Sequence, residues 1–163
     1  MIHRASLAAV GAVETAIAVR AGDPKVSVRD TGALRATLLA SDAIFVPDTK
    51  ASTAGIHVAK VLGDLGIADE VAARLKVYPN GATAMRHLAA SRALRPIGCT
   101  QATEIISTEG VELSGPLPPG CELKTVYTAA IAAHAARAEA AQTLINLLTA
   151  REQSDLRARA GFL

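Results

Sequence analysis

The sequence predicts an α/β fold, a three-layer helix–sheet–helix lobe with a mostly parallel sheet, from three observations. Short segments rich in Val and Ile alternate with longer segments in which apolar residues recur at helical spacing. The chain has 163 residues, which is about the length of one domain. Half of the residues are apolar but only 2% are aromatic, so the core must consist mainly of Ala, Val, Leu and Ile.

Strands are expected where short apolar or alternating segments end at turn residues. The predicted strands are 14–20, 43–46, 75–78, 95–99 and 111–114. Pro47 and Pro79 end two of them, and Pro96 indicates either an edge strand or the start of a strand. The segments 43–46 and 75–78 have the composition of buried core strands.

Helices are expected between these strands, because capping residues precede the periodic apolar segments. Asp30 or Thr31 can cap a helix that carries Leu34 and Leu38, and Asn80 can cap the helix that carries Met85. Further helices are predicted from about 53 to 65, for a short stretch from 69, within 100–106, and over 138–148 and 151–159.

The charged residues argue against binding to nucleic acid or insertion into a membrane. The net charge is +2, from 17 basic and 15 acidic residues that are interspersed along the chain. A nucleic-acid-binding protein usually shows a basic stripe, often with stacking aromatic residues. No apolar segment reaches the ~20 residues that a membrane span needs. We therefore expect neither nucleic acid as a partner nor a membrane span.

The reactive side chains do not form a recognisable catalytic or metal-binding pattern. His57 and His87 fall within helices and are expected to be surface residues, and no nucleophile–base pair can be assigned. Cys99 and Cys121 cannot bind a structural zinc ion by themselves. Two interpretations stay open for them, two buried thiols or one disulfide. We predict no catalytic residue, no metal and no cofactor, and hence not an enzyme.

Three strand-to-helix junctions are the best candidates for a ligand site. In open α/β sheets, ligands bind beyond the carboxyl ends of strands, where helices begin. The junctions are 48–55, rich in hydroxyl groups and small residues, 80–83 and 98–101. The free N–H groups and the dipole at a helix N-terminus favour an anion. If the three junctions converge on one edge of the sheet, they predict a site for a small anion.

The order of motifs along the chain resembles the second lobe of class II periplasmic solute-binding proteins of the molybdate-binding type. Residues 16–25 (AIAVRAGDPK) are similar to the strand and turn that enter that lobe. Residues 65–71 (LGIADEV), 97–105 (IGCTQATEI) and 111–118 (VELSGPLP) are similar to three later motifs of the family. The resemblance runs from about residue 14 to the end of the chain.

This resemblance implies a protein that binds a small solute, such as the oxyanion molybdate, for an ABC importer. The family's second-lobe contacts would fall at three places in this chain. The implied ligand-binding residues are Ser52, Thr53, Ala54, Gly55, Gly81, Ala82, Thr100 and Gln101. The resemblance thus places the contacts at the same junctions that the pattern of strands and helices indicates.

The chain also departs from this family, whose members are longer and carry an export signal and a complete first lobe. We expect an N-terminal extension over 1–13, a single solute-binding lobe with C-terminal helices over 14–163, and a truncated relative of the family. Without a convincing export signal, the chain as written is expected to be cytoplasmic. The alternative function is a cytoplasmic ligand sensor or interaction protein that uses the same lobe without transport.

Without a first lobe, the apolar faces of the last strand and helix would be uncovered. These faces carry Val126, Ile131, Leu144, Ile145 and Leu148. Large uncovered apolar patches usually mark an interface. We therefore predict a homodimer.

Overall fold

In the computed structural model, which describes residues 1–163, the contacts divide the chain into two compact units. One unit comprises residues 14–123, and the other comprises residues 1–13 together with 124–163. The division expected from the sequence, an extension over 1–13 and one lobe over 14–163, stays a prediction. The C-terminal segment associates with the N-terminal residues because strand β6 (Lys124–Ala129) pairs with strand β1 (Ala8–Arg20).

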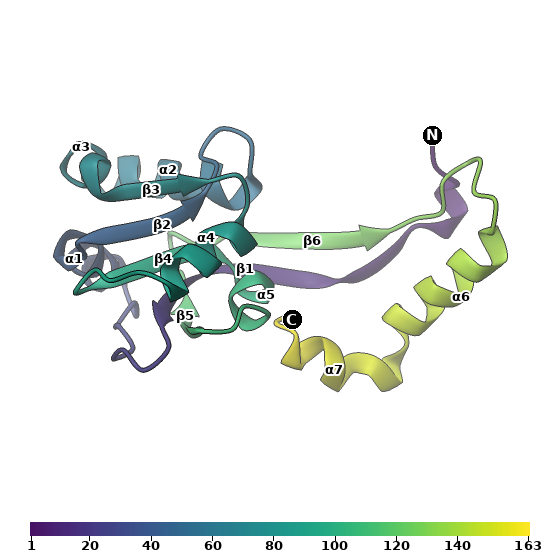
Figure 1. Ribbon diagram of the computed structural model, residues 1–163. Coiled ribbons are helices and arrows are strands. Elements are labelled where there is room, and N and C mark those ends of the chain that lie inside the picture. Colours follow the sequence, from purple (N-terminus) through teal and green to yellow (C-terminus); the bar gives the residue numbers. More distant parts are fainter. The chain divides into compact units, whose positions relative to one another are not determined.

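The unit 14–123 is built on a mixed sheet whose strand order is β3-β2-β4-β1-β5 (Figure 1). Strand β2 (Ala43–Pro47) lies parallel to β3 (Leu75–Tyr78) and to β4 (Pro96–Gln101). Strand β1 runs antiparallel to β4 and to β5 (Val111–Pro116). The predicted α/β class is confirmed, and the parallel part of the sheet is β3-β2-β4.

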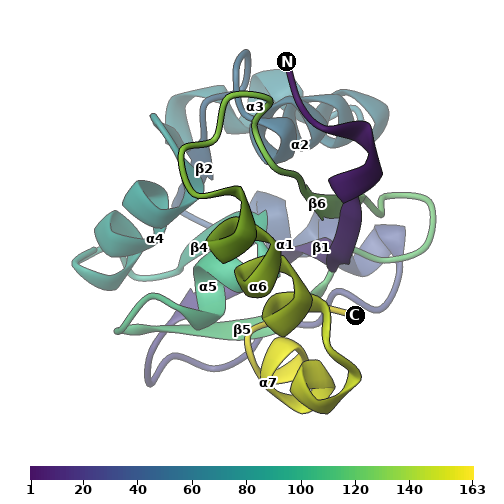
Figure 2. The same cartoon turned by 90° about the vertical axis from the view of Figure 1, so that its right-hand side faces the viewer.

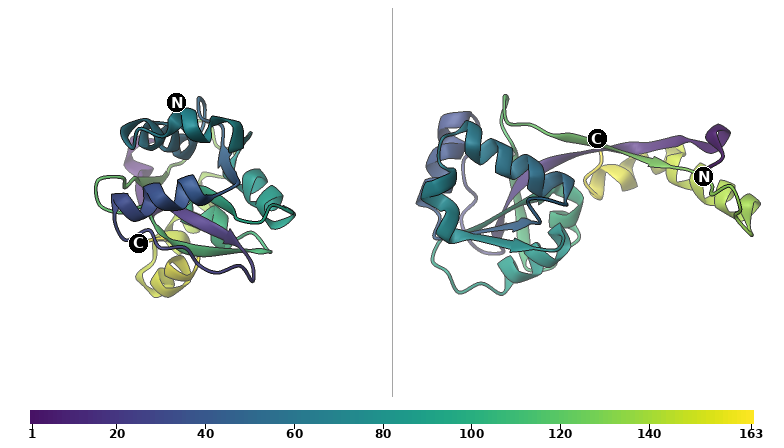
Figure 3. Two further views of the ribbon diagram at one scale, coloured as in Figure 1. Left: turned by 90° about the vertical axis from the view of Figure 1, so that its left-hand side faces the viewer. Right: turned by 90° about the horizontal axis from the view of Figure 1, so that it is seen from above.

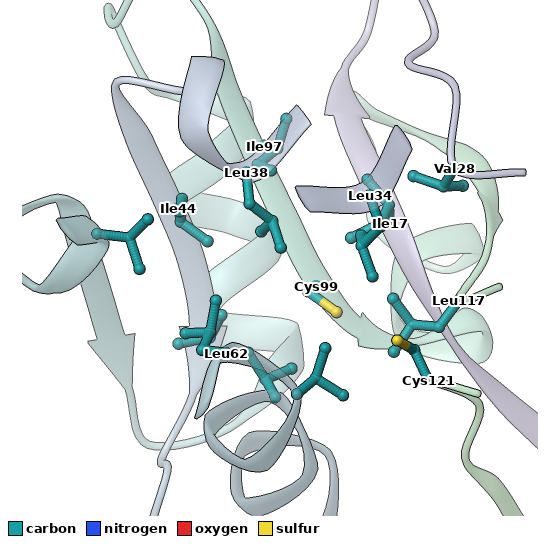
Figure 4. Close-up of a cluster of buried hydrophobic side chains, with 14 of the residues drawn as sticks. Ile17, Val28, Leu34, Leu38, Ile44, Leu62, Ile97, Cys99, Leu117 and Cys121 are labelled. Carbon is teal, nitrogen blue, oxygen red and sulfur yellow. The ribbon is translucent and has the colours of Figure 1, made fainter. Parts of the chain in front are cut away.

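Helices cover both faces of this sheet, as the views in Figures 1 and 3 show. Ile17 and Cys99 face each other across β1 and β4 and belong to the main apolar cluster. That cluster also contains Leu34 and Leu38 of α1 (Thr31–Ala40) and Leu62 of α2 (Thr53–Asp64), and Figure 4 shows it in close-up.

The opposite face of β4 packs against helix α4 (Gly81–Ala89). A Cβ atom at Gly98 would lie less than 3.0 Å from side-chain atoms of Met85 and Leu88. The chain completes this unit with α3 (Ala68–Val71), the 3₁₀ turn η2 (Ala72–Arg74) and α5 (Ala102–Ile106). The sheet is therefore the middle one of three layers, as the sequence predicts.

The predicted caps of α1 and α4 are confirmed. The Asp30 carboxylate accepts a hydrogen bond from Ala33 N at 2.7 Å, and the Asn80 side chain accepts one from Thr83 N at 2.8 Å. Pro96 begins β4, which is a central strand and not an edge strand. The strand 75–78 was expected in the core but is a half-exposed edge strand, because β2 is its only neighbour.

The second unit consists of short elements around the β1–β6 pair. They are η1 (Arg4–Ser6), α6 (Ala138–Thr149), η3 (Arg151–Gln153) and α7 (Ser154–Arg159), and Figure 2 shows α6 and α7 following each other. Its two chain ends are tied to it, because His3 N donates to Ile131 O at 2.9 Å and Leu163 N donates to Ala12 O at 2.8 Å.

The predicted uncovered apolar face of this unit is only partly present. Val126, Leu144 and Leu148 are 63%, 54% and 42% exposed. Ile131 and Ile145, which were predicted to be uncovered, are buried at 7% and 6%. None of the helices in the structure combines the length and the apolar character that a membrane crossing requires.

Acid is expected to destabilise the protein through Asp30 and Asp42, whose pKa values lie below the usual 3.8. A hydrogen bond from the Ala33 backbone N–H lowers the pKa of Asp30. Desolvation raises the pKa of Asp42, but the N–H groups of Arg95 and Leu94 outweigh it. Each carboxylate therefore contributes stability above its unfolded pKa, and this is lost as the pH falls through the lower folded value.

The measurement is urea unfolding between pH 6 and pH 2.5. The free energy of unfolding should fall with acidification, and Asp42→Asn should reduce the slope of that fall. Asp155→Asn, at a carboxylate that makes no hydrogen bond or ion pair in the structure, is the matched control. An unchanged slope in Asp42→Asn would show that the Asp42 carboxylate does not stabilise the fold.

Candidate functional site

The three junctions singled out in the sequence lie at one edge of the sheet in the unit 14–123. Because β2 is parallel to both β3 and β4, the carboxyl ends of the three strands point the same way. The loops that follow these strands lead into α2, α4 and α5. We call the three loop segments, residues 48–55, 79–83 and 100–104, the rim.

The first rim segment is a tight loop that is organised by Asp48. The Asp48 carboxylate accepts hydrogen bonds from Lys50 N at 2.7 Å and from Ala51 N at 3.0 Å. The carbonyl of the same residue accepts one from Ser52 N at 3.0 Å. This loop delivers the chain to the first turn of α2 in a fixed direction.

The N-terminus of α2 has no side-chain cap, unlike those of α1 and α4. Ser52 is the N-cap residue, and its side chain makes no capping hydrogen bond. The first N–H groups of a helix have no partner within the helix, so those of Thr53 and Ala54 can be given to a ligand. Helix α2 has 12 residues, which gives its positive end the charge that attracts anions.

Gly55 lies under this loop and has a structural role that its sequence context did not reveal. A Cβ atom at this position would lie less than 3.0 Å from the backbone oxygens of Pro47 and Asp48. Helix α2 therefore approaches the end of β2 so closely that only glycine fits. Gly55 is buried, so it shapes the rim from beneath.

The second rim segment brings the start of α4 against the third segment. A Cβ atom at Gly81 would lie less than 3.0 Å from Glu104 Oε2 and from Thr100 Oγ1. Thr100 Oγ1 donates a hydrogen bond to Glu104 Oε2 at 2.5 Å. Gly81 thus allows α4 to begin directly beside the Thr100–Glu104 pair, and a carboxylate lies at the rim.

The third rim segment is buried and is joined to β1. Thr100 is fully buried and Gln101 is 5% exposed. Gln101 is paired with Thr15 of β1, so Thr15 also lies at the rim end of the sheet. The Thr15 hydroxyl is buried and has no hydrogen-bond partner. A buried hydroxyl without a partner is costly, so it is a group that a ligand or an ordered water can satisfy.

The structure thus brings all the sequence-predicted site residues to one edge of the sheet, and they differ in how far they are exposed. Ser52 and Ala82 are half-exposed, and Thr53 is exposed. Ala54, Gly55, Gly81, Thr100 and Gln101 are buried.

Thr15 and Glu104 were not predicted as site residues. Thr15 lies more than 80 positions before Gln101, and only the strand pairing reveals that the two are neighbours. Glu104 is half-exposed, and its carboxylate accepts the Thr100 hydroxyl.

Side chains elsewhere in the unit are held in structural contacts. His57 Nε2 lies 2.8 Å from Cys121 O, so His57 is not a free surface histidine. The exposed His87 ring stacks on Tyr78 with ring centres 4.2 Å apart. Both cysteines are free and buried, and desolvation raises the pKa of Cys99 to about 12. No group of three or more His, Cys, Asp or Glu side chains is placed to hold a metal ion.

In three-layer α/β units, ligands bind beyond the carboxyl ends of the strands, and here the uncapped helix α2 begins at that edge. The chain belongs to the family of bacterial extracellular solute-binding proteins, because the model of that family matches residues 3–163. No curated protein matches the chain.

Solved structures share the fold at low sequence identity. The periplasmic molybdate-binding protein of Azotobacter vinelandii has a TM-score of 0.75 and 17% identity, and the match covers 99% of this chain and 69% of that one. The substrate-binding domain of a putative molybdenum ABC transporter from Clostridium difficile has a TM-score of 0.72 and 11% identity, covering 99% and 68%. The sulfate-binding protein SubI from Mycobacterium tuberculosis has a TM-score of 0.66 and 20% identity, covering 93% and 56%. These identities show a common fold, and the chain spans from about half to two thirds of these structures.

Proposed function

We propose that the rim binds a small anionic solute, an oxyanion such as molybdate, and that the chain serves as a substrate-binding component of an ABC importer. The observation that carries this proposal is the uncapped N-terminus of the 12-residue helix α2, at the same edge of the sheet as the start of α4. The two helix dipoles and their free N–H groups attract negative charge. The protein binds its ligand without chemical change.

The rim provides donors suited to a compact anion. The backbone N–H groups of Thr53 and Ala54 at α2 and of Ala82 at α4 are the principal donors. The hydroxyl groups of Ser52 and Thr53 supplement them. Thr100 has a supporting role, because its hydroxyl proton is already donated to Glu104. Backbone N–H groups suit an oxyanion because each donates a hydrogen bond to one of its oxygens in a direction that the helix fixes.

The experiment is a thermal-unfolding series with molybdate, tungstate, sulfate and phosphate at constant ionic strength. A ligand that binds only the folded state stabilises it by RT ln(1 + [L]/Kd), which is about 2.7 kcal/mol at one hundred times Kd. At least one oxyanion should raise the unfolding temperature by several degrees, whereas nitrate should not. Equal responses to all five anions, or no response to any, would contradict the proposal.

Glu104 should weaken the binding of divalent anions, because its carboxylate lies at the rim. We expect Glu104→Gln to bind molybdate about three- to tenfold more tightly, since removing one charge relieves repulsion on the order of 1 kcal/mol. Titration calorimetry at low and physiological salt measures the effect, and the gain should shrink as salt screens the charges.

Glu109→Gln, at the exposed residue beyond the end of α5, is the matched control for this charge removal. It should leave the affinity for molybdate unchanged. Weaker binding in Glu104→Gln, or an equal gain in Glu109→Gln, would show that the charge of Glu104 does not act at the rim.

We propose further that the protein forms a homodimer through the unit that contains β6 and α6. This unit exposes several large apolar side chains, namely Val126, Leu144, Leu147 and Leu148. A second copy is the partner that would cover such a patch symmetrically. The sequence-based cytoplasmic location stays a prediction, and the family is extracellular.

Light scattering at micromolar concentration tests the homodimer. The double variant Leu144→Gln/Leu148→Gln should shift the mass from dimer to monomer, whereas Val77→Gln, at an exposed residue of β3, should not. A monomeric mass for the unmodified protein would contradict this proposal.

A further inference from the structure

A cavity lies at the opposite end of the sheet from the rim, within the unit 14–123. It has a volume of about 370 Å³, which is in the range of sites for small organic molecules. Val19 near the end of β1 and Ile97 near the start of β4 line it, together with the last turn of α1 and the loops 23–27 and 94–95. Because β4 runs from this cavity to the rim, the two sites are separated by the length of the strand.

One wall of the cavity is held in place by hydrogen bonds to the loop 91–95. The Asp42 carboxylate accepts hydrogen bonds from Leu94 N at 2.9 Å and from Arg95 N at 3.0 Å. The Arg20 guanidinium donates to Ala93 O at 3.3 Å. The loop is therefore fixed at both sides of its tip, where Leu94 is 87% exposed at the mouth of the cavity.

The opposite wall is the loop 23–27, which is tied to two neighbouring elements. Ser114 stands at an irregularity in the β1–β5 pairing, and its Oγ accepts from Val26 N at 2.8 Å and donates to Val26 O at 3.1 Å. Thr37 Oγ1 of α1 donates to Ser27 O at 3.1 Å. Both walls are thus braced by the fold, and the cavity needs no rearrangement to exist.

The lining combines apolar side chains with two basic ones. Val19, Val26 and Ile97 provide apolar surface. Lys25 and Arg95 are exposed side chains at the cavity that form no salt bridge, and the Arg95 charge also acts on the nearby Asp42 carboxylate.

Negative groups also lie nearby, but they are already engaged. Asp23 is paired with Arg20 at 3.0 Å, and Asp42 accepts the two N–H groups described above. Counting Arg20, Lys25 and Arg95 against Asp23 and Asp42, the surroundings carry one net positive charge.

We propose that this cavity is a second ligand site, which binds a small organic monoanion with an apolar body, such as an aromatic or branched aliphatic carboxylate. The apolar body lies against Val19, Val26 and Ile97, and the carboxylate pairs with Arg95 and Lys25. A bare oxyanion has no apolar surface to pack against Val19, Val26 and Ile97. The two sites of the protein therefore take different classes of anion. The second site therefore does not depend on the oxyanion function of the rim.

The test uses 2-naphthoate as the probe, with its neutral alcohol analogue 2-naphthalenemethanol for comparison. Binding is followed by amide chemical-shift changes and by calorimetry. We expect 2-naphthoate to bind at least tenfold more tightly than the alcohol, and to shift the amides of Val26, Ser27 and Leu94 in preference to those of the rim. A saturating oxyanion should leave the affinity for 2-naphthoate unchanged.

Two variants test separately whether the positive charge and the cavity itself are needed for binding. Arg95→Gln should weaken 2-naphthoate binding about tenfold, and Lys76→Gln, at an exposed lysine of β3, should not change it. Ala40→Phe, at an exposed position that lines the cavity, should block binding while the thermal unfolding temperature shows that the variant is folded. No binding of 2-naphthoate, equal binding of the alcohol, or shifts confined to the rim would each overturn the proposal.

Discussion

Replacing Gly55 by alanine is expected to lower the free energy of unfolding by about 3 kcal/mol or more. The added Cβ would meet the backbone oxygens of Pro47 and Asp48, and backbone cannot move aside as the end of a side chain can. Overpacking in a well-packed site costs about 1–3 kcal/mol, and more where the neighbours are rigid. The same displacement would push the start of α2 away from the loop that precedes it.

The matched control for this substitution is Gly63→Ala in the same helix. A Cβ atom at Gly63 has nothing within 4 Å, so alanine should stabilise the helix by up to about 1 kcal/mol. Urea unfolding of both variants gives the comparison. Similar unfolding free energies for Gly55→Ala and Gly63→Ala would show that the helix does not approach β2 as closely as described.

Replacing Gly81 by alanine is expected to break the contact between α4 and the Thr100–Glu104 pair. The added Cβ would displace the Glu104 carboxylate and the Thr100 hydroxyl, at a cost of about 1–3 kcal/mol in unfolding free energy. The rim would then lose the arrangement of its second and third segments, and oxyanion binding should weaken with the stability.

A double-mutant cycle distinguishes this steric cause from a general loss of helix stability. In a background with Thr100→Ala and Glu104→Ala, Gly81→Ala should cost less than about 0.5 kcal/mol, because the colliding atoms are gone. The coupling energy is read from urea unfolding of the four proteins. An equal cost of Gly81→Ala in both backgrounds would show that the Thr100–Glu104 pair is not its neighbour.

Local signals in the sequence predicted the helices and most of the strands well, since a cap or a proline acts over a few residues. Asp30, Asn80 and Pro96 mark element starts in the structure as expected. The start of β1 at Ala8 was not predicted, because residues 1–13 were interpreted as an N-terminal extension. Residues 8–13 belong to β1, which pairs with β6 more than 100 positions away, and no local pattern carries that information.

The ligand contacts predicted for Gly55 and Gly81 stay a prediction. The structure adds a steric reason for glycine at both positions, because an added Cβ would lie less than 3.0 Å from neighbouring atoms. Likewise, the burial of Ile145 follows from how its unit folds, while its helical spacing with Leu144 and Leu148 suggested one common exposed face. Periodicity identifies the apolar side of an element, and the tertiary contacts decide which part of that side is covered.

The central claim, that the rim binds an oxyanion through backbone N–H groups at α2, is tested most directly by proline substitution at Thr53. Thr53 is the first residue of α2, where proline fits the helix but removes the N–H donor. Ser52 before it already has an extended backbone (φ −88°, ψ 135°), which proline requires. Thr53→Ala keeps the N–H and removes only the hydroxyl, and Thr31→Pro places the same change at the start of α1.

Titration calorimetry of these variants with the oxyanion that stabilises the unmodified protein most is the decisive measurement. The account predicts that Thr53→Pro weakens binding at least tenfold, that Thr53→Ala weakens it less, and that Thr31→Pro leaves it unchanged. Unaltered affinity in a folded Thr53→Pro variant would contradict it.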